Sequence, residues 1–131
     1  MPDTPSFLPL DLASEYYMDE RCYIVEVSNS AADPDLSIAR ARVTPGVTTR
    51  WHCVHASTER YVIQSGQGLM EVGELPPQAV GPGDVVVIPP GWRQRITNVG
   101  AEDLVFLAIC TPRFRFEAYE DVDPEPLPAQ S

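Results

Sequence analysis

Short apolar segments separated by glycine and proline limit the fold of this chain more than any other feature of its sequence. The segments have the length of β-strands and are rich in Val, Ile, Tyr or Phe. They cover residues 21–27, 36–43, 59–65, 68–73, 84–90, 93–99 and 102–110. Glycine and proline, the residues typical of turns, lie between them, and no window long enough for a core helix has a helical period. The pattern predicts an all-β fold, an antiparallel double-sheet sandwich or barrel.

The length of 131 residues predicts one domain. Residues 1–20 combine prolines with acidic residues, and we expect an N-terminal arm with one helical turn near residues 13–17. Residues 119–131 are acidic and rich in proline, and so are expected to form a solvated tail. The barrel is therefore predicted to span residues 21–118.

The charge of the chain excludes several classes of function. The formal net charge is −10, and all nine basic residues are arginines. Without lysine, the chain can form neither a lysine Schiff base nor a phosphate-binding loop with a catalytic lysine. The excess of acid argues against nucleic acid and anionic membranes as partners, because both require a basic surface.

Three sequence features predict a cytoplasmic protein with free thiols. No segment is apolar for long enough to span a membrane, and the first twenty residues lack the basic start of a signal peptide. Cys22, Cys53 and Cys110 are widely spaced and form no CxxC pair.

Two spaced motifs in the middle of the chain resemble those of the cupin family. In the first, Gly46 is separated by five residues from His52, and Glu59 by six residues from Gly66. In the second, which runs from Gly83 to Asn98, the glycines, the proline and the asparagine keep the family spacing, but Gln94 stands where the family has a histidine. The resemblance covers roughly residues 36–111 and implies an antiparallel double-stranded β-helix, or jelly-roll barrel.

The first motif can be aligned with the family in two registers. Counting from Gly46 places His52 at the first histidine position and Val54 at the second, whereas counting back from Glu59 places Cys53 first and His55 second. Neighbouring side chains of a strand point to opposite faces, so only a bulge could direct both histidines inward. We favour the register of His52, because Gly46 fixes the turn before it, and we expect Cys53 to face away.

The resemblance implies a divalent metal inside the barrel. The ligands carried over are His52, Glu59 and Gln94, with His55 as a further candidate, and the metal would be manganese, iron, nickel or zinc. A glutamine carbonyl oxygen has no full charge, so metal affinity is expected to be weak.

The function expected from this resemblance is that of a small-molecule cupin. In an enzyme of the dioxygenase, isomerase or lyase type, Glu59 would be a metal ligand or the catalytic base. The alternative is a metal-free module that binds a small organic ligand, and a structural or storage role is a third hypothesis. A homodimer is also expected, because many cupins pair through sheet edges, and a bare edge strand is a liability.

Overall fold

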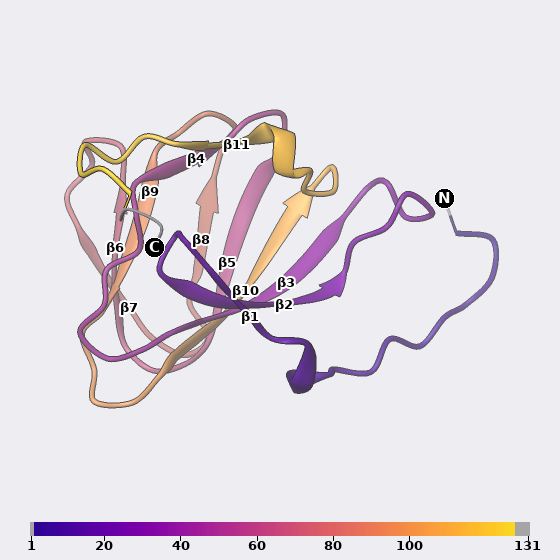
Figure 1. Ribbon diagram of the computed structural model, residues 1–131, viewed down its shortest axis with the longest axis horizontal. Helices are drawn as coiled ribbons and strands as arrows, with labels where there is room; N and C mark the ends of the chain where they lie inside the picture. Colours follow the sequence, from indigo (N-terminus) through magenta and orange to yellow (C-terminus); the bar gives the residue numbers. More distant parts are fainter. Residues whose placement is uncertain (1, 128–131) are drawn as a thin grey trace.

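Two antiparallel sheets face each other and enclose the interior of the computed structural model (Figure 1). The model describes residues 2–127; residue 1 and residues 128–131, the end of the predicted tail, lie outside the described part. The six-stranded sheet has the order β1 (Tyr16–Met18), β2 (Cys22–Ser28), β3 (Ser37–Val43), β10 (Leu104–Thr111), β5 (Thr58–Ser65) and β8 (Val85–Ile88). The five-stranded sheet has the order β11 (Tyr119–Asp121), β4 (His52–Val54), β9 (Gln94–Asn98), β6 (Gly68–Val72) and β7 (Gln78–Val80).

The described residues contain no α-helix, only the two short 3-10 turns η1 (Leu12–Ser14) and η2 (Phe116–Ala118). The predicted all-β antiparallel fold is therefore confirmed. No helix of the described chain has the length and apolar character needed to cross a membrane.

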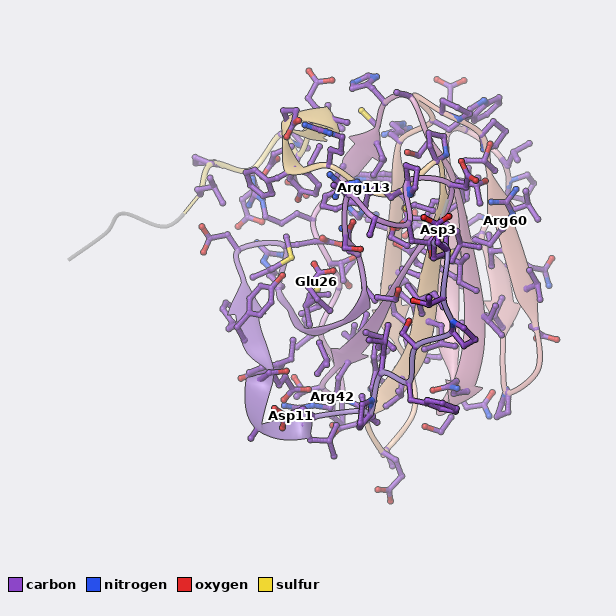
Figure 2. The ribbon with its side chains drawn as sticks, turned by 90° about the vertical axis from the view of Figure 1, so that its right-hand side faces the viewer. Asp3, Asp11, Glu26, Arg42, Arg60 and Arg113 are labelled. Atoms are coloured by element: carbon purple, nitrogen blue, oxygen red, sulfur yellow. The ribbon has the colours of Figure 1, made fainter. Side chains whose placement is uncertain are left out.

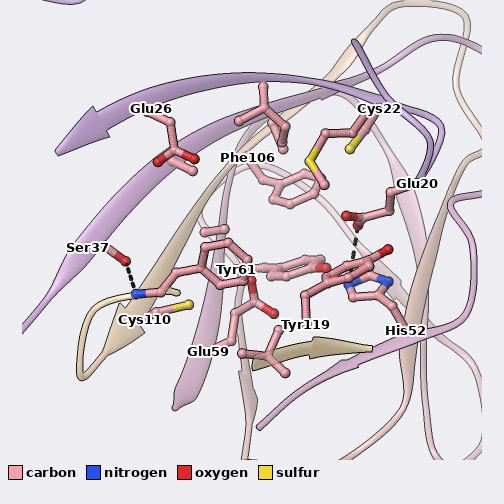
Figure 3. Close-up of a pocket in the computed structure, with 17 residues that line it drawn as sticks. Glu20, Cys22, Glu26, Ser37, His52, Glu59, Tyr61, Phe106, Cys110 and Tyr119 are labelled. Atoms are coloured by element: carbon pink, nitrogen blue, oxygen red, sulfur yellow. Dashed lines mark hydrogen bonds and ion pairs between the residues drawn. The ribbon is translucent and has the colours of Figure 1, made fainter. Parts of the chain in front are cut away.

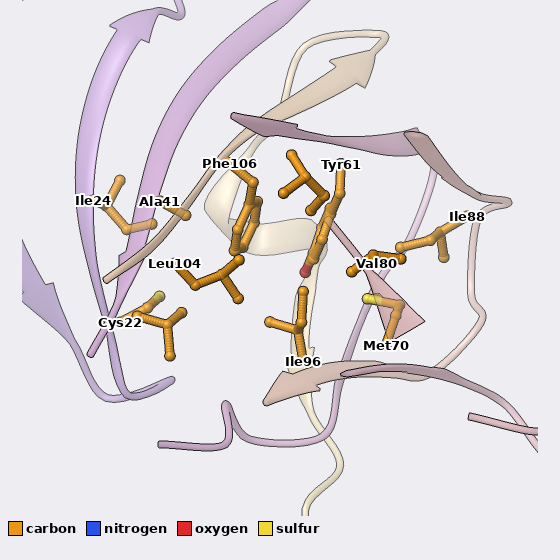
Figure 4. Close-up of a cluster of buried hydrophobic side chains, with 12 residues drawn as sticks. Cys22, Ile24, Ala41, Tyr61, Met70, Val80, Ile88, Ile96, Leu104 and Phe106 are labelled. Atoms are coloured by element: carbon orange, nitrogen blue, oxygen red, sulfur yellow. The ribbon is translucent and has the colours of Figure 1, made fainter. Parts of the chain in front are cut away.

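Strand alternation decides which side chains reach the interior. Along β5, Glu59, Tyr61 and Ile63 are buried, and the residues between them are partly exposed. Tyr61 stacks on Phe106 of β10, with ring centroids 4.3 Å apart, inside a core supplied by both sheets (Figure 4). The same alternation along β9 buries Gln94. Two residues of the predicted site thus share faces with the hydrophobic core.

Two motif positions hold loops at the ends of strands. Gly66 has a φ of +90°, and a Cβ atom there would lie 2.6 Å from the carbonyl oxygen of Asp103. Only glycine accepts both conditions. The buried amide of Asn98 donates hydrogen bonds to the carbonyls of Val43 and Glu102, each at 2.8 Å. These residues maintain the barrel and take no part in the candidate site.

The N-terminal arm is shorter than predicted. Residues 16–18 form β1, which pairs with β2, and the helical turn lies at residues 12–14 rather than near 13–17. Arg42, labelled in Figure 2, lies on the outer face of β3 and anchors this segment. Its guanidinium donates to Glu15 at 2.6 Å and to Asp103 at 3.2 Å. Sequence patterns did not reveal this pairing between distant residues. The residues before η1 run outside the sheets (Figure 1). Phe7 among them is 93% exposed.

The C-terminal segment also differs from the expected solvated tail. Residues 119–121 form β11 and pair with β4. The buried guanidinium of Arg50 donates to Asp121 Oδ2 at 2.7 Å, and the amide of Trp51 donates to Asp123 Oδ2 at 2.9 Å. The acids that suggested a solvated tail are thus the partners of a buried arginine and a backbone amide.

Candidate functional site

A cavity of about 70 Å³ opens between the two sheets, on the inner face of β4 and β5 (Figure 3). One water needs about 10–15 Å³ of such volume, so the space suits a small molecule. Most of the lining is apolar or aromatic, with a few acidic and hydrogen-bonding groups. The labelled lining residues are Glu20, Cys22, Glu26, Ser37, His52, Glu59, Tyr61, Phe106, Cys110 and Tyr119.

His52 lies on the inner face of β4 and is 2% exposed. Its Nδ1 lies 2.8 Å from the carbonyl oxygen of Arg50, and since a carbonyl only accepts, Nδ1 is the donor. The other nitrogen, Nε2, lies 3.2 Å from Glu20 Oε1. The ring stacks on Tyr119, with centroids 5.4 Å apart. The hydrogen bond to the backbone therefore fixes the imidazole, and Nε2 is the ring nitrogen that can gain or donate a proton in the cavity.

Glu20, which the sequence patterns did not single out, is a partner of this histidine. It lies in the turn between β1 and β2, and its carbonyl accepts a hydrogen bond from the amide of Arg50 at 3.0 Å. Burial raises the pKa of Glu20, while the charge of His52 lowers it and that of Asp121 raises it. An acid beside a predicted strand was the only sequence signal, and it did not distinguish Glu20 from Asp19.

Glu59 enters the cavity from β5 beside Tyr61, as predicted from strand alternation. Burial raises its pKa to about 6; the charge of His52 lowers the pKa, that of Glu20 raises it, and hydrogen bonds from Gln94 and Cys110 lower it. Its Oε1 atom is buried without a hydrogen-bond partner among the described residues. The carboxyl group can therefore gain or lose a proton close to neutral pH.

Gln94 faces the interior from β9, directly opposite His52 in the strand pairing. It is 1% exposed, and its Oε1 has no hydrogen-bond partner among the described residues. His52, Glu59 and Gln94 thus share the inner face, and the register that starts from Gly46 agrees with the geometry.

His55 does not join these three residues. Its side chain is 53% exposed and contacts Cys53 and Glu120 on the outer face. The reason is the regular alternation of β4, which directs His52 and Val54 inward and Cys53 outward without a bulge.

The interior residues do not fit the imidazole-rich metal site that the resemblance implies. Only one imidazole faces the cavity, Val54 lines it where the second histidine would lie, and His52 Nε2 already contacts Glu20. Among residues 2–127, the group of three His, Cys, Asp or Glu side chains whose ligand atoms lie within 4.8 Å of one another is Cys53, His55 and Glu120, outside the barrel. The chemistry open to the interior is therefore that of its own side chains. The interior offers the imidazole of His52 and the carboxyl groups of Glu20 and Glu59, with Glu26 farther along the same wall of a largely apolar cavity, an arrangement suited to proton transfer.

Comparisons with known proteins agree with this architecture. A family model described as "Cupin domain" matches residues 39–110, more than half of the chain. Glucose-6-phosphate isomerase from Pyrococcus furiosus is 30% identical, over 72% of this chain and 63% of that protein. The chain thus spans less than two thirds of this relative.

Solved structures show the same fold at lower identity. Pac13, described as a nucleoside dehydratase, has a TM-score of 0.73 and 16% identity, over 90% of this chain and 92% of its own. A Streptomyces variant of that protein has been solved with uridine. KdgF from Halomonas sp. has a TM-score of 0.73 and 19% identity, over 86% of this chain and 98% of its own. The predicted jelly-roll barrel is thereby confirmed.

Proposed function

This chain belongs to the cupin family, and from that premise we propose that it is a small-molecule cupin whose barrel transfers protons on a neutral, hydroxylated compound. The single observation that carries the proposal is the 3.2 Å contact between His52 Nε2 and Glu20 Oε1, in the cavity that also contains Glu59. General acids and bases work best with a pKa close to the working pH. The pKa of about 6 for Glu59 meets this condition.

The geometry supports different roles for the three groups. Glu59, as a carboxylate, accepts a proton from a carbon or hydroxyl group of the substrate. His52 in its imidazolium form gives the Nε2 proton to a substrate oxygen. Glu59 then passes the proton it has taken to His52 through solvent, so both groups return to their starting forms and the net change moves one proton between two substrate atoms. Glu20 is a positioning residue, because it holds the Nε2 side of the ring while the Arg50 carbonyl holds Nδ1.

The lining supports a neutral substrate rather than a phosphorylated one. It contains two buried acids close together and no arginine, so a phosphate would meet negative charge without a partner. Tyr61, Phe106 and Tyr119 offer aromatic surface, on which a sugar or a base could pack. The relatives whose names mention a sugar phosphate and a nucleoside share a hydroxylated ring, and we carry only that chemistry over to this chain.

The test uses uridine, glucose and glucose 6-phosphate as probes in nuclear magnetic resonance titrations. We expect the neutral probes to shift the signals of His52 and Tyr61 and the phosphate to leave them unchanged. Carbon-bound hydrogens next to a carbonyl group should exchange in D₂O with the wild-type protein, so fructose, a ketose whose minor open-chain form carries such hydrogens, is added as a fourth probe. Glu59→Gln should retain binding and lose exchange, while the matched outer variant Glu120→Gln should retain both. Exchange that survives in Glu59→Gln contradicts the proposed role.

A metal-free binding module is the second candidate. The buried, unpartnered Glu59 Oε1 and Gln94 Oε1 favour it, because a ligand with two donor groups would satisfy both oxygens without any reaction. Binding of the neutral probes without hydrogen exchange in the wild-type protein would favour this candidate over the enzyme.

A further inference from the structure

Three side chains with metal-binding atoms meet on the outer face of the barrel, on the side of β4 away from the cavity. Glu120 Oε1 lies 2.9 Å from His55 Nε2 and 3.4 Å from Cys53 Sγ. Cys53 Sγ and His55 Nε2 are 3.6 Å apart. The three atoms form a small triangle.

Strand pairing brings these residues together from the middle of the chain and from its C-terminal segment. Cys53 of β4 and Glu120 of β11 are direct partners in the antiparallel register, so their side chains lie on the same face. His55 is two residues beyond Cys53 and shares that face. Its amide donates to the carbonyl of Ala118 at 2.8 Å, which holds the end of β4 against the segment before β11. The backbone therefore fixes all three positions.

The contacts differ from those of a nucleophilic triad. In such a triad the histidine contacts the nucleophile with one ring nitrogen and the carboxylate with the other. Here Cys53 and Glu120 contact the same nitrogen, Nε2 of His55. Three ligand atoms that converge on one point suit a bound cation better than a proton relay.

We propose that Cys53, His55 and Glu120 bind a zinc ion on the outer face of the barrel, with the fourth coordination position open to water. With zinc at its usual distances from sulfur, nitrogen and oxygen, ligand atoms in a tetrahedron lie about 3.4 to 3.6 Å apart. Two of the three measured separations already have these values, and the third, at 2.9 Å, needs only a small rotation of exposed side chains. A thiolate and an imidazole favour zinc over magnesium or calcium.

The exposure of the residues agrees with an accessible site that has an open position. Cys53 is buried at 4% exposure, which protects the thiolate, whereas the side chains of His55 and Glu120 are 53% and 57% exposed. The ion would tie β11 to β4. Because Tyr119 of β11 stacks on His52 in the cavity, the outer ion would also stabilise one wall of the inner site. The zinc proposal itself does not depend on the chemistry inside the barrel.

The test is calorimetric titration of the untagged protein with zinc, together with cobalt(II) absorption spectroscopy. We expect one zinc ion per chain and a sulfur-to-cobalt charge-transfer band, which reports a thiolate ligand. Cys53→Ser should remove that band. His55→Ala and Glu120→Gln should each weaken zinc binding at least about tenfold, because loss of a residue that only supports a metal ligand already costs about that much affinity. The matched inner variants Cys110→Ser and Glu59→Gln should leave zinc affinity and the band unchanged.

Two results would overturn the proposal. One is zinc binding that survives the three outer variants or is lost in the inner ones, and the other is a wild-type protein that binds no zinc. Because His55 and Glu120 are largely exposed, their variants should fold, and a melting curve without metal checks this. In the wild-type protein zinc should raise the melting temperature by mass action, and at the same zinc concentration it should raise that of Glu120→Gln less.

Discussion

His52 Nε2 lies 3.2 Å from Glu20 Oε1, so a turn near the N-terminus and a strand in the middle of the chain meet inside the barrel. The same turn is tied to the strand by the hydrogen bond from the Arg50 amide to the Glu20 carbonyl. Glu20 therefore occupies a side of the imidazole that a metal would need. This contact and the absence of further inward-facing histidines together separate the interior from the family's metal site.

The charges around Glu59 should change its pKa in opposite directions when they are removed. The charge of Glu20 raises the pKa of Glu59 and that of His52 lowers it. We therefore expect Glu20→Gln to bring the pKa of Glu59 below about 6 and His52→Gln to bring it higher. Carboxyl carbon resonances followed against pH would measure both, with Glu26→Gln, farther along the cavity wall, as the control. If the pKa of Glu59 shifted in the same direction in both variants, Glu20 and His52 would not both lie close to Glu59 as described.

Because the pKa of Glu59 is raised, the free energy of unfolding of Glu59→Gln, relative to that of the wild type, should be higher at neutral pH than at acid pH. The ordinary value of 4.5 applies to the unfolded chain, and the folded value is about 6. Between these values the folded state binds more protons, so stability falls as the pH rises through this window. Across this window the free energy of unfolding of the wild-type protein falls by about 2 kcal/mol because Glu59 loses its proton. The side chain of Glu59→Gln has no such proton, so the variant does not show this fall.

Urea unfolding of both proteins at about pH 4.5 and about pH 7.5 would measure that change. Relative to the wild type, Glu59→Gln should gain about 2 kcal/mol between the two conditions. Glu120→Gln is the matched control with the opposite sign, because hydrogen bonds from His55 and Cys53 lower the pKa of Glu120. A difference between Glu59→Gln and the wild type that does not depend on pH would show that Glu59 is not buried as described.

Removal of Asp121 should release the C-terminal segment. Arg50 is 2% exposed, and Asp121 accepts from its Nε at 2.7 Å, so Asp121→Ala leaves a buried guanidinium without its carboxylate. We expect a lower free energy of unfolding and faster proteolysis after residue 118. The exposed pair Arg115–Glu117 supplies the control, since Glu117→Ala should change stability little. Equal effects of the two variants would argue against a docked segment.

Restoring imidazoles should turn the interior into a metal site. Val54 and Gln94 occupy the positions at which histidines are missing, and both face inward with His52 and Glu59. In a Glu120→Gln background, which weakens the outer cluster, Val54→His with Gln94→His should bind manganese or nickel at least about tenfold more tightly than the background protein. Calorimetric titration measures the affinity, and His52→Ala should abolish the gain. No gain in the double variant would mean that these side chains do not converge.

The homodimer remains a prediction that sedimentation can test. The edge strand β8 of the six-stranded sheet exposes Val85 and Val87 at 56% and 60%. We expect a dimer at micromolar concentration. The double variant Val85→Lys with Val87→Lys should shift toward monomer, because charged side chains on an edge strand oppose its pairing with a strand of another copy. A wild-type protein that sediments as a clean monomer would contradict the prediction.

The fold and three of the four interior residues, His52, Glu59 and Gln94 but not Glu20, could be predicted, because local patterns and the family-like motif spacing indicate them. Alternation along residues 59–65 puts Glu59 on the same face as Tyr61. The resemblance to the cupin motif, aligned from Gly46, implied the inner position of His52, where the structure places it. Glu20 and Glu120 could not be predicted in the same way. Each lies in an acidic stretch at an end of the chain, where no periodicity distinguishes one carboxylate from the next.

By itself, the sequence determined where the chain turns and which face each strand buries. Gly66 lies at a turn, and its positive φ of +90° is a local condition that the sequence pattern indicates, whereas the carbonyl of Asp103 that would meet a Cβ atom there is brought close only by the fold. Only the tertiary structure decided that the predicted arm supplies β1 and Glu20, and that the predicted tail supplies β11. The physical reason is that a strand at a sheet edge is selected by long-range pairing and by buried partners such as Arg50. Those partners exist only after the barrel has closed.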